Sequence, residues 1–264
     1  MSASRRPFLA TLALLLAFAG VSGCSLLPDK IDETRNWSAA KFYSEAKDAL
    51  DNGNYQQAIT YYEKLQARYP FGKYAQQAQL ESIYAYYKDS EPDSAIAAAD
   101  RFIKTNPRHP YVDYAYYLKG LVNFNRADGP VDRLLPADPT RTDSATAMQS
   151  FNDFNELVTK FPDSKYAPDA RQRMLFLRNN LASYEVNVAA FYLERGAYVA
   201  AVNRGKYVLE NYSSAPAAAD ALAVMTRAYA AMGMRDLARD YLRVLRENAP
   251  NRADLPQLSA LVEG

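Results

Sequence analysis

Gly53-Asn54-Tyr55-Gln56-Gln57-Ala58 is the stretch of sequence that decides the fold. It returns as Gly196-Ala197-Tyr198-Val199-Ala200-Ala201, with Gly, Tyr and Ala at the same spacing. Each copy lies between two segments in which apolar residues recur at helical spacing. Gly is common just past a helix end, because it adopts the left-handed backbone conformation without steric cost. The repeated pattern therefore predicts pairs of helices joined by tight turns.

Both turns resemble the tetratricopeptide repeat, in which the aromatic residue packs behind the turn and the small Ala lets the two helices approach closely. Five such landmark positions occur, at Ala58, Ala95, Ser150, Ala201 and Ala238. Together they predict an all-α fold, a right-handed superhelical solenoid of five tetratricopeptide-type helix pairs with a concave groove lined by the first helices.

The fourth unit departs from this pattern. Gly205 stands where the repeat has a bulky residue, and Ser213 stands where it has Pro. We therefore expect the second helix of this unit to pack differently from the others.

Two units are longer than the rest. The stretch 126–143 contains Gly129 and three Pro residues, which predicts an inserted loop projecting from the third helix pair. The stretch Ala167 to Arg195 has no Gly or Pro after Pro168. Here we predict a single helix of about 28 residues and about 40 Å, long enough to project past its neighbours and offer them a docking surface.

Three unit boundaries share a further pattern, with Tyr one helical turn after Pro. They are Pro70 to Tyr74, Pro107 to Tyr111 and Pro162 to Tyr166. Pro ends a helix because it has no amide proton to donate. We expect each Tyr to begin the next helix and to fill the gap between units.

The first residues have the layout of a secretory signal peptide, predicted at 1–23. Arg5 and Arg6 precede an apolar run from Phe8 to Gly20. A membrane-spanning helix is the alternative, but it needs about 20 apolar residues and this run is shorter. The Arg pair also resembles a twin-arginine signal, although nothing in the sequence suggests the cofactor that such cargo usually carries, so general secretion (Sec) is favoured.

The segment Val21-Ser22-Gly23-Cys24 resembles a bacterial lipobox. Cys24 is the only cysteine, so no disulfide can form within the chain, and we expect it to carry the acyl chains, such as palmitate, of a lipoprotein. Residues 24–37 would then be an acylated linker. Ser25 is not the Asp that retains lipoproteins in the inner membrane, which favours the outer membrane, with the mature chain facing the periplasm.

The sequence offers little for chemistry. It has 31 basic and 30 acidic residues, and removing the signal would take away Arg5 and Arg6, so no basic face for nucleic acid is indicated. His109 is the only histidine and stands next to Pro110 in a linker, without a second His or a free Cys to complete a metal site or a nucleophile pair. No phosphate-binding glycine motif or CxxC occurs. We predict a scaffold that is not an enzyme, with no catalytic residue, cofactor or metal.

Tetratricopeptide folds line their groove with fixed positions of each first helix. With first helices starting at Ala39 and Gln76, these positions are Ala40, Tyr43, Lys47, Leu50, Asp51, Gln77, Leu80, Tyr84, Tyr87 and Lys88. The candidate substrate-binding residues among them are Tyr43, Lys47, Tyr84, Tyr87 and Lys88. Tyr combines apolar area with a hydroxyl and Lys offers a charge, so the set would suit an extended peptide with aromatic residues and a terminal carboxylate. The alternative is that each Tyr only packs between helices.

Longer segments are similar to the BamD family, lipoproteins of the outer-membrane β-barrel assembly machinery. They are Arg68 to Gly72, Ile83 to Lys88, Asp100 to Ile103, Asn106 to Pro110 apart from Arg108, Glu194 to Ala200 and Val202 to Arg204. The resemblance implies a scaffold that promotes the folding and insertion of outer-membrane proteins. Its implied partners are BamA, through the last POTRA domain, other assembly lipoproteins, and unfolded outer-membrane proteins bound by their C-terminal signals.

The same resemblance implies roles for single residues. Tyr69, Pro70 and Phe71 fall in the half that handles substrate, residues 38–125. Arg195, Asn203 and Arg204 fall in the half that docks on BamA, residues 144–250. The alternative for the two Arg residues is that they are ordinary solvated cations near helix ends. The loop 126–143 and the tail 251–264 depart from the family, so no contact is implied there.

Two other functions remain open at this point. A pilotin-like tetratricopeptide lipoprotein that helps a secretin assemble would have nearly regular units, and the two enlargements count against it. A weak hydrolase acting through His109 is a distant third.

Overall fold

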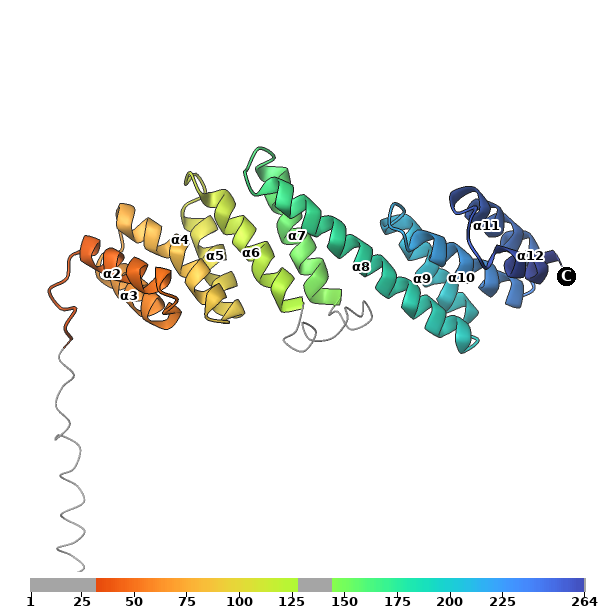
Figure 1. Ribbon diagram of the computed structural model, residues 1–264, viewed down its shortest axis with the longest axis horizontal. Coiled ribbons are helices and arrows are strands. Elements are labelled where there is room, and N and C mark those ends of the chain that lie inside the picture. Colours follow the sequence, from red (N-terminus) through yellow and green to blue (C-terminus); the bar gives the residue numbers. More distant parts are fainter. Residues whose placement is uncertain (1–31, 128–143, 264) are drawn as a thin grey trace, which may run out of the picture. The chain divides into compact units, whose positions relative to one another are not determined.

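The computed structural model describes residues 32–127 and 144–263, in two units, Met1–Ser38 and Ala39–Gly264. The described part of the first unit is a turn in which the backbone N–H of Thr34 donates to Asp32 Oδ1 at 3.1 Å. The described helices all belong to the second unit (Figure 1), and no strand occurs in the ranges just given. The all-α prediction is confirmed.

The helices follow one another along the second unit with short connections (Figure 1). They are α2 (Ala39–Asp51), α3 (Tyr55–Arg68), α4 (Lys73–Lys88), α5 (Pro92–Thr105), α6 (Val112–Ala127), α7 (Ser144–Lys160), α8 (Ala167–Glu194), α9 (Tyr198–Asn211), α10 (Ala218–Ala231), α11 (Arg235–Asn248) and α12 (Leu255–Glu263).

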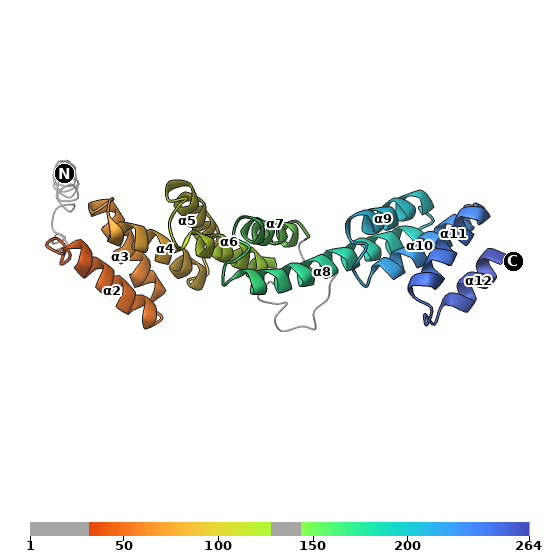
Figure 2. The same cartoon turned by 90° about the horizontal axis from the view of Figure 1, so that it is seen from above.

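The helices from α2 to α11 form five pairs, α2/α3 to α10/α11. Each helix packs mainly against the one before it and the one after it, and weaker contacts join the first helices α2, α4 and α6. Figure 2 shows the pairs following one another along the unit. This nearest-neighbour packing is that of a solenoid and confirms the predicted tetratricopeptide-type architecture.

The landmark residues explain why the pairs form. All five positions, Ala58, Ala95, Ser150, Ala201 and Ala238, are completely buried. A small side chain at each lets a second helix approach its first helix closely, as the repeat pattern predicts. At the turns, Gly53, Gly196 and Gly233 have φ of 76°, 76° and 73°, a conformation that other residues rarely adopt.

The long helix predicted from the second enlargement is confirmed. α8 has 28 residues, from Ala167 to Glu194. It packs on α7 and on α9, and it contributes to both hydrophobic clusters of the unit, with Leu181 in the first and Ala189 in the second. α8 therefore joins the amino-terminal repeats to the carboxy-terminal repeats through one continuous element.

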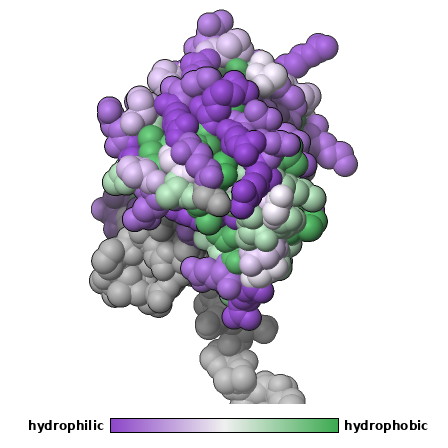
Figure 3. All heavy atoms as spheres, turned by 90° about the vertical axis from the view of Figure 1, so that its right-hand side faces the viewer, coloured by the Kyte–Doolittle hydropathy of each residue, from purple (hydrophilic) through white to green (hydrophobic). Residues whose placement is uncertain are grey.

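The tail, residues 251–264, contains one more helix. Residues 255–263 form α12, which packs on α10 and α11 through the buried side chains of Leu258 and Val262. Solenoids need a terminal element that covers the last hydrophobic face. Figure 3 looks onto this end of the molecule, where hydrophilic side chains cover most of the visible surface and smaller apolar areas lie between them.

Three expectations need correction. The first helix of the second repeat, α4, begins at Lys73 and not at Gln76, because Gly72, with φ 97°, precedes it. Tyr111 does not fill a gap between units, because 59% of it is exposed. Arg126 and Ala127 still belong to α6, so the inserted segment begins after them.

The predicted signal peptide, Cys24 and the rest of the inserted segment lie outside the described residues. The other two boundary tyrosines behave as expected. Tyr74 lies 5.6 Å from Tyr43 of the preceding pair, and Tyr166 stacks on Tyr117 at 4.8 Å, measured between ring centroids.

Candidate peptide-binding groove

A groove of about 400 Å³ lies on the face made by the first helices. α2, α4 and α6 supply most of its lining, together with the first residue of α3. The lining residues are Lys47, Leu50, Asp51, Tyr55, Glu81, Tyr84 and Tyr114. Of the predicted substrate residues, Lys47 and Tyr84 lie directly in it.

Glu81 is the centre of the groove's hydrogen bonding. Its Oε1 accepts a hydrogen bond from the hydroxyl of Tyr43 at 2.8 Å, and its Oε2 accepts one from the hydroxyl of Tyr62 at 2.7 Å. Burial raises the pKa of both tyrosines well above 10, and the carboxylate of Glu81 adds to the rise. Both hydroxyls therefore stay protonated, and they hold Glu81 in a fixed position between two helix pairs.

Lys47 is already engaged within the protein. Its Nζ lies 2.7 Å from Asp51 Oδ1 and 3.8 Å from Glu81 Oε2. The hydrogen bond to Asp51 raises the pKa of Lys47 although partial burial acts against it. Two carboxylates and one ammonium leave this part of the groove with net negative charge, so Lys47 is a poor receptor for a peptide carboxylate unless Asp51 moves.

Lys88 is the better placed cation. It is exposed at the end of α4, and its Nζ lies 5.8 Å from the ring centroid of Tyr55, which lines the groove. Tyr87 is next to Tyr84, with ring centroids 6.3 Å apart, and its hydroxyl accepts a hydrogen bond from Asn125. Four of the predicted substrate residues, Lys47, Tyr84, Tyr87 and Lys88, thus gather around one end of the helices.

An aromatic path leads away from that end. Tyr43 lies between Tyr62 and Tyr74, with ring centroids 6.2 and 5.6 Å apart. On the other side of the groove, Tyr114 stacks on Tyr166 at 5.2 Å. Partly exposed tyrosines offer both a flat apolar face and a polar edge, which suits contacts with aromatic side chains of a peptide.

Tyr69, Pro70 and Phe71 lie at the opposite end of the second helix. They follow α3, whose 14 residues span about 20 Å, whereas the groove meets the start of that helix at Tyr55. Phe71 is 90% exposed and Tyr69 is half-buried. The predicted substrate residues therefore form two groups, one at the groove and one after the end of α3.

The three predicted partner residues lie on the pair α8/α9. Arg195 caps the end of α8 and its guanidinium carbon lies 4.3 Å from the ring centroid of Phe191, which is 49% exposed. Arg204 Nη1 pairs with Glu185 Oε2 at 2.9 Å, and Asn203 beside it is exposed. Because Glu185 and Arg195 are about 15 Å apart along α8, the two Arg residues must meet different groups of a partner.

Sequence reasoning missed three lining residues of the groove. Glu81 lies next to Leu80, the position that the assumed register selected, and Leu80 is buried. Tyr114 belongs to α6, the first helix of the third pair, and the predicted groove positions cover only the first two pairs. The sequence pattern places Tyr55 only at the turn. The i, i+4 spacing of Lys47 and Asp51 was the signal in the sequence that could have revealed their ion pair.

The described residues give little support to a catalytic or metal-binding function. His109 accepts a hydrogen bond from the backbone N–H of Tyr111 and packs edge-on against Phe102. Within ranges 32–127 and 144–263, no group of three His, Cys, Asp or Glu side chains could hold a metal ion, and no helix is both long enough and apolar enough to cross a membrane.

Comparison with known proteins now adds a family. The sequence matches the family YfiO, described as outer membrane lipoprotein, over residues 35–244. It is 40% identical over 252 residues to the outer membrane protein assembly factor BamD of Neisseria meningitidis serogroup B, covering 96% of this chain and 94% of that protein. The chain belongs to the BamD family.

Further relatives carry the same name. The relative from Xylella fastidiosa Temecula1 is 38% identical, covering 91% of this chain and 82% of its own, and that from Vibrio cholerae is 37% identical, covering 86% and 92%. These relatives are named as assembly factors, which confirms the prediction of a non-enzymatic scaffold and does not favour a pilotin. Among solved structures, a tetratricopeptide repeat protein from Parabacteroides merdae is 14% identical with a TM-score of 0.39, covering 88% and 87%, too loose a likeness to indicate function.

Proposed function

We propose that this chain is an outer membrane protein assembly factor, a lipoprotein anchored through Cys24 that faces the periplasm. The observation that carries the proposal is the shared BamD name of relatives that match nearly the whole chain. The solenoid supplies two separate surfaces for the task. The groove of the amino-terminal repeats receives the C-terminal signals of unfolded outer-membrane proteins, and the α8/α9 pair docks on the POTRA domain of BamA.

The groove suits an extended peptide with aromatic side chains. Tyr84 and Tyr114 give it apolar faces, and Lys88 stands at its edge for the peptide's terminal carboxylate. Glu81 and Asp51 can accept hydrogen bonds from backbone N–H groups, which an extended strand presents on both sides. Phe71, exposed after the end of α3, would contact a more distant apolar residue of the same substrate.

The α8/α9 surface suits an acidic partner. A carboxylate of BamA can compete with Glu185 for Arg204, whose side chain is 45% exposed. Arg195, fixed over Phe191, can bind a second acidic group about 15 Å away. Two cations held at a fixed separation give a partner both orientation and charge complementarity.

Tyr69→Ala tests the substrate half. The full chain carries a photo-crosslinker in the groove. Two quantities are measured in the same preparation: the yield of crosslinks to newly made barrel proteins and the amount of BamA that co-purifies. We expect fewer substrate crosslinks and an unchanged BamA complex. If both survive the substitution, the assignment of Tyr69 to substrate binding is wrong.

Affinity purification from detergent-solubilised outer membranes tests the partner. BamA and other assembly lipoproteins in the eluate support the proposal. A secretin in place of BamA would contradict it and support a pilotin-like role. Loss of a measurable hydrolase activity on His109→Ala would instead point to an enzyme.

A further inference from the structure

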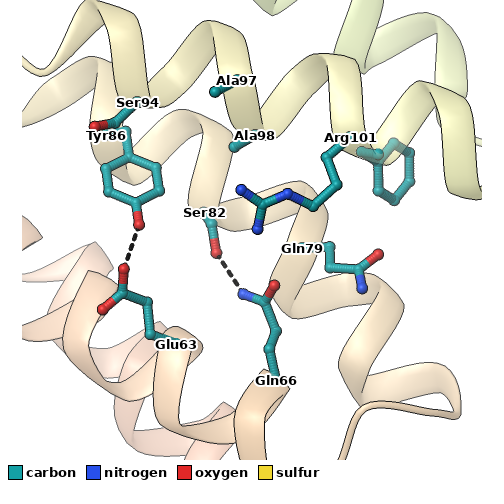
Figure 4. A pocket seen from close by; sticks show the side chains of 10 residues that line it. Glu63, Gln66, Gln79, Ser82, Tyr86, Ser94, Ala97, Ala98 and Arg101 are labelled. Atoms are coloured by element: carbon teal, nitrogen blue, oxygen red, sulfur yellow. Dashed lines mark hydrogen bonds between the residues drawn. The ribbon is translucent and has the colours of Figure 1, made fainter.

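A second pocket lies between α3, α4 and α5 (Figure 4), and its lining shares no residue with the first-helix groove. Its volume is about 230 Å³. The polar residues that line it are Glu63, Gln66, Gln79, Ser82, Tyr86, Ser94 and Arg101. None of them belongs to the candidate substrate or partner residues, so the pocket stands apart from the proposed function.

Most polar groups of the pocket are engaged with one another. Glu63 accepts the hydroxyl of Tyr86 at 2.6 Å, and Gln66 Nε2 donates to Ser82 Oγ at 3.1 Å (Figure 4). Ser82 in turn donates to the backbone oxygen one turn earlier at 2.6 Å. These bonds fix the floor of the pocket before any ligand arrives.

Arg101 is the exception. It extends from α5 into the pocket, with its guanidinium near Gln66 (Figure 4). In the part of the chain that the structure describes, it forms no ion pair and its guanidinium donates no hydrogen bond. Gln79 adds to the unused donors, since its Oε1 accepts from Asn106 at 3.0 Å while its amide N–H groups remain available.

We propose that this pocket binds a carboxylate of a partner protein, with Arg101 as its two-point receptor and Gln79 as an additional donor. The guanidinium fork matches a carboxylate with two parallel hydrogen bonds. The lining side chains of Ala97 and Ala98 are small, so an acidic side chain has room to enter. Glu63 places an acidic side chain in the same pocket, which favours a singly charged carboxylate over a doubly charged phosphate as the ligand.

The carboxylate can come from an acidic side chain or from the end of a chain. Two small probes separate these sources: N-acetylglutamate amide carries only a side-chain carboxylate, and N-acetylglycine carries only a terminal one. N-acetylglutamine amide is the neutral control, and sodium chloride matches the ionic strength.

The test is a titration of the full, isotopically labelled protein, followed by nuclear magnetic resonance. The Nε–H signal of Arg101 is identified by its loss in Arg101→Gln. We expect at least one carboxylate probe to shift this signal and the backbone amides of Ala97 and Ala98 with saturation in the millimolar range. The probe that binds more tightly identifies the source.

Substitutions make the assignment specific. Arg101→Gln should weaken binding by at least about tenfold, measured on the amide signals of Ala97 and Ala98. The affinity of Arg101→Lys should lie between those of Arg101→Gln and the unsubstituted protein, because Lys keeps the charge but cannot donate two parallel hydrogen bonds. Lys104→Gln, an exposed cation on the same helix outside the pocket, should change nothing. A shift that does not saturate, that the salt alone reproduces, or that persists in Arg101→Gln would overturn the proposal.

Discussion

Met225 of α10 occupies the space in which a side chain at Gly205 of α9 would lie. A Cβ at position 205 would be 2.5 Å from Met225 Cγ and 2.7 Å from Met225 Sδ. Met225 is fully buried. The bulk that the repeat pattern places at position 205 is therefore supplied by the next helix, which is the physical reason why the fourth unit departs from the others.

Gly205→Ala should destabilise the protein by about 1–3 kcal/mol, because the new methyl group overlaps the fully buried side chain of Met225. Urea unfolding measures the change. Combining it with Met225→Ala should cost less than the two single changes added together, since the second removes the overlap. Additive costs would show that Met225 is not the obstacle.

Tyr62→Phe tests the hydrogen bonding around Glu81. Tyr62 is fully buried and donates to Glu81 Oε2 at 2.7 Å, so losing its hydroxyl should cost about 1–3 kcal/mol of unfolding free energy. Tyr111→Phe, at an exposed site, is the matched control and should cost almost nothing. Equal effects of the two substitutions would contradict the role given to Glu81.

Asp153 should make stability depend on pH. Burial raises the pKa of its carboxyl above the ordinary 3.8, although Asn123, Lys119 and Gln149 act in the opposite direction. Above pH 3.8 the unfolded chain loses this proton before the folded chain does, so the contribution of Asp153 to stability falls as pH rises.

Asp153→Asn removes that contribution. We expect the variant to gain stability relative to the unsubstituted protein between pH 4 and about pH 7, measured by urea unfolding at each pH. The exposed Asp163→Asn reports the effect of removing one charge alone. A relative loss of stability of Asp153→Asn over this range would give the opposite sign and refute the assignment.

Arg252 should hold the terminal helix in place. It pairs with Asp220 of α10 at 2.6 Å and with Asp254 at 2.8 Å, just before α12 begins. Arg252→Ala should speed hydrogen exchange of α12 amides while leaving the global unfolding free energy nearly unchanged. Arg239→Ala, which loses only a local exposed pair, is the control. Unchanged hydrogen exchange in α12 would show that the packing of Leu258 and Val262 is enough to hold this helix in place.

The sequence predicts the repeats well because their signal is local. A small residue at each landmark and the Gly at three of the turns act within one helix pair, and the absence of Gly and Pro after Pro168 is enough to predict α8. The start of α4 was misplaced because Gly72, rather than the repeat spacing, sets it. That small error in register is why Leu80 was selected in place of Glu81.

Contacts between separate helices cannot be predicted from the spacing of residues along the sequence. The pairing of Arg204 with Glu185 and the packing of Met225 against Gly205 each depend on how two helices lie side by side. The packing of α12 likewise depends on a hydrophobic face that only the folded solenoid presents. The candidate residues could therefore be predicted one by one, whereas the residues that they contact in other helices could not.

The proposed function requires that one chain offers two independent binding surfaces. Its most direct test measures, in the same cells, substrate crosslinks and BamA co-purification for Tyr84→Ala and Arg204→Ala, with Tyr111→Ala and Lys206→Ala as matched controls. The account predicts that Tyr84→Ala loses substrate and keeps BamA, that Arg204→Ala does the reverse, and that both controls keep both. If either substitution abolishes both interactions in a folded protein, or neither affects any, the account is contradicted.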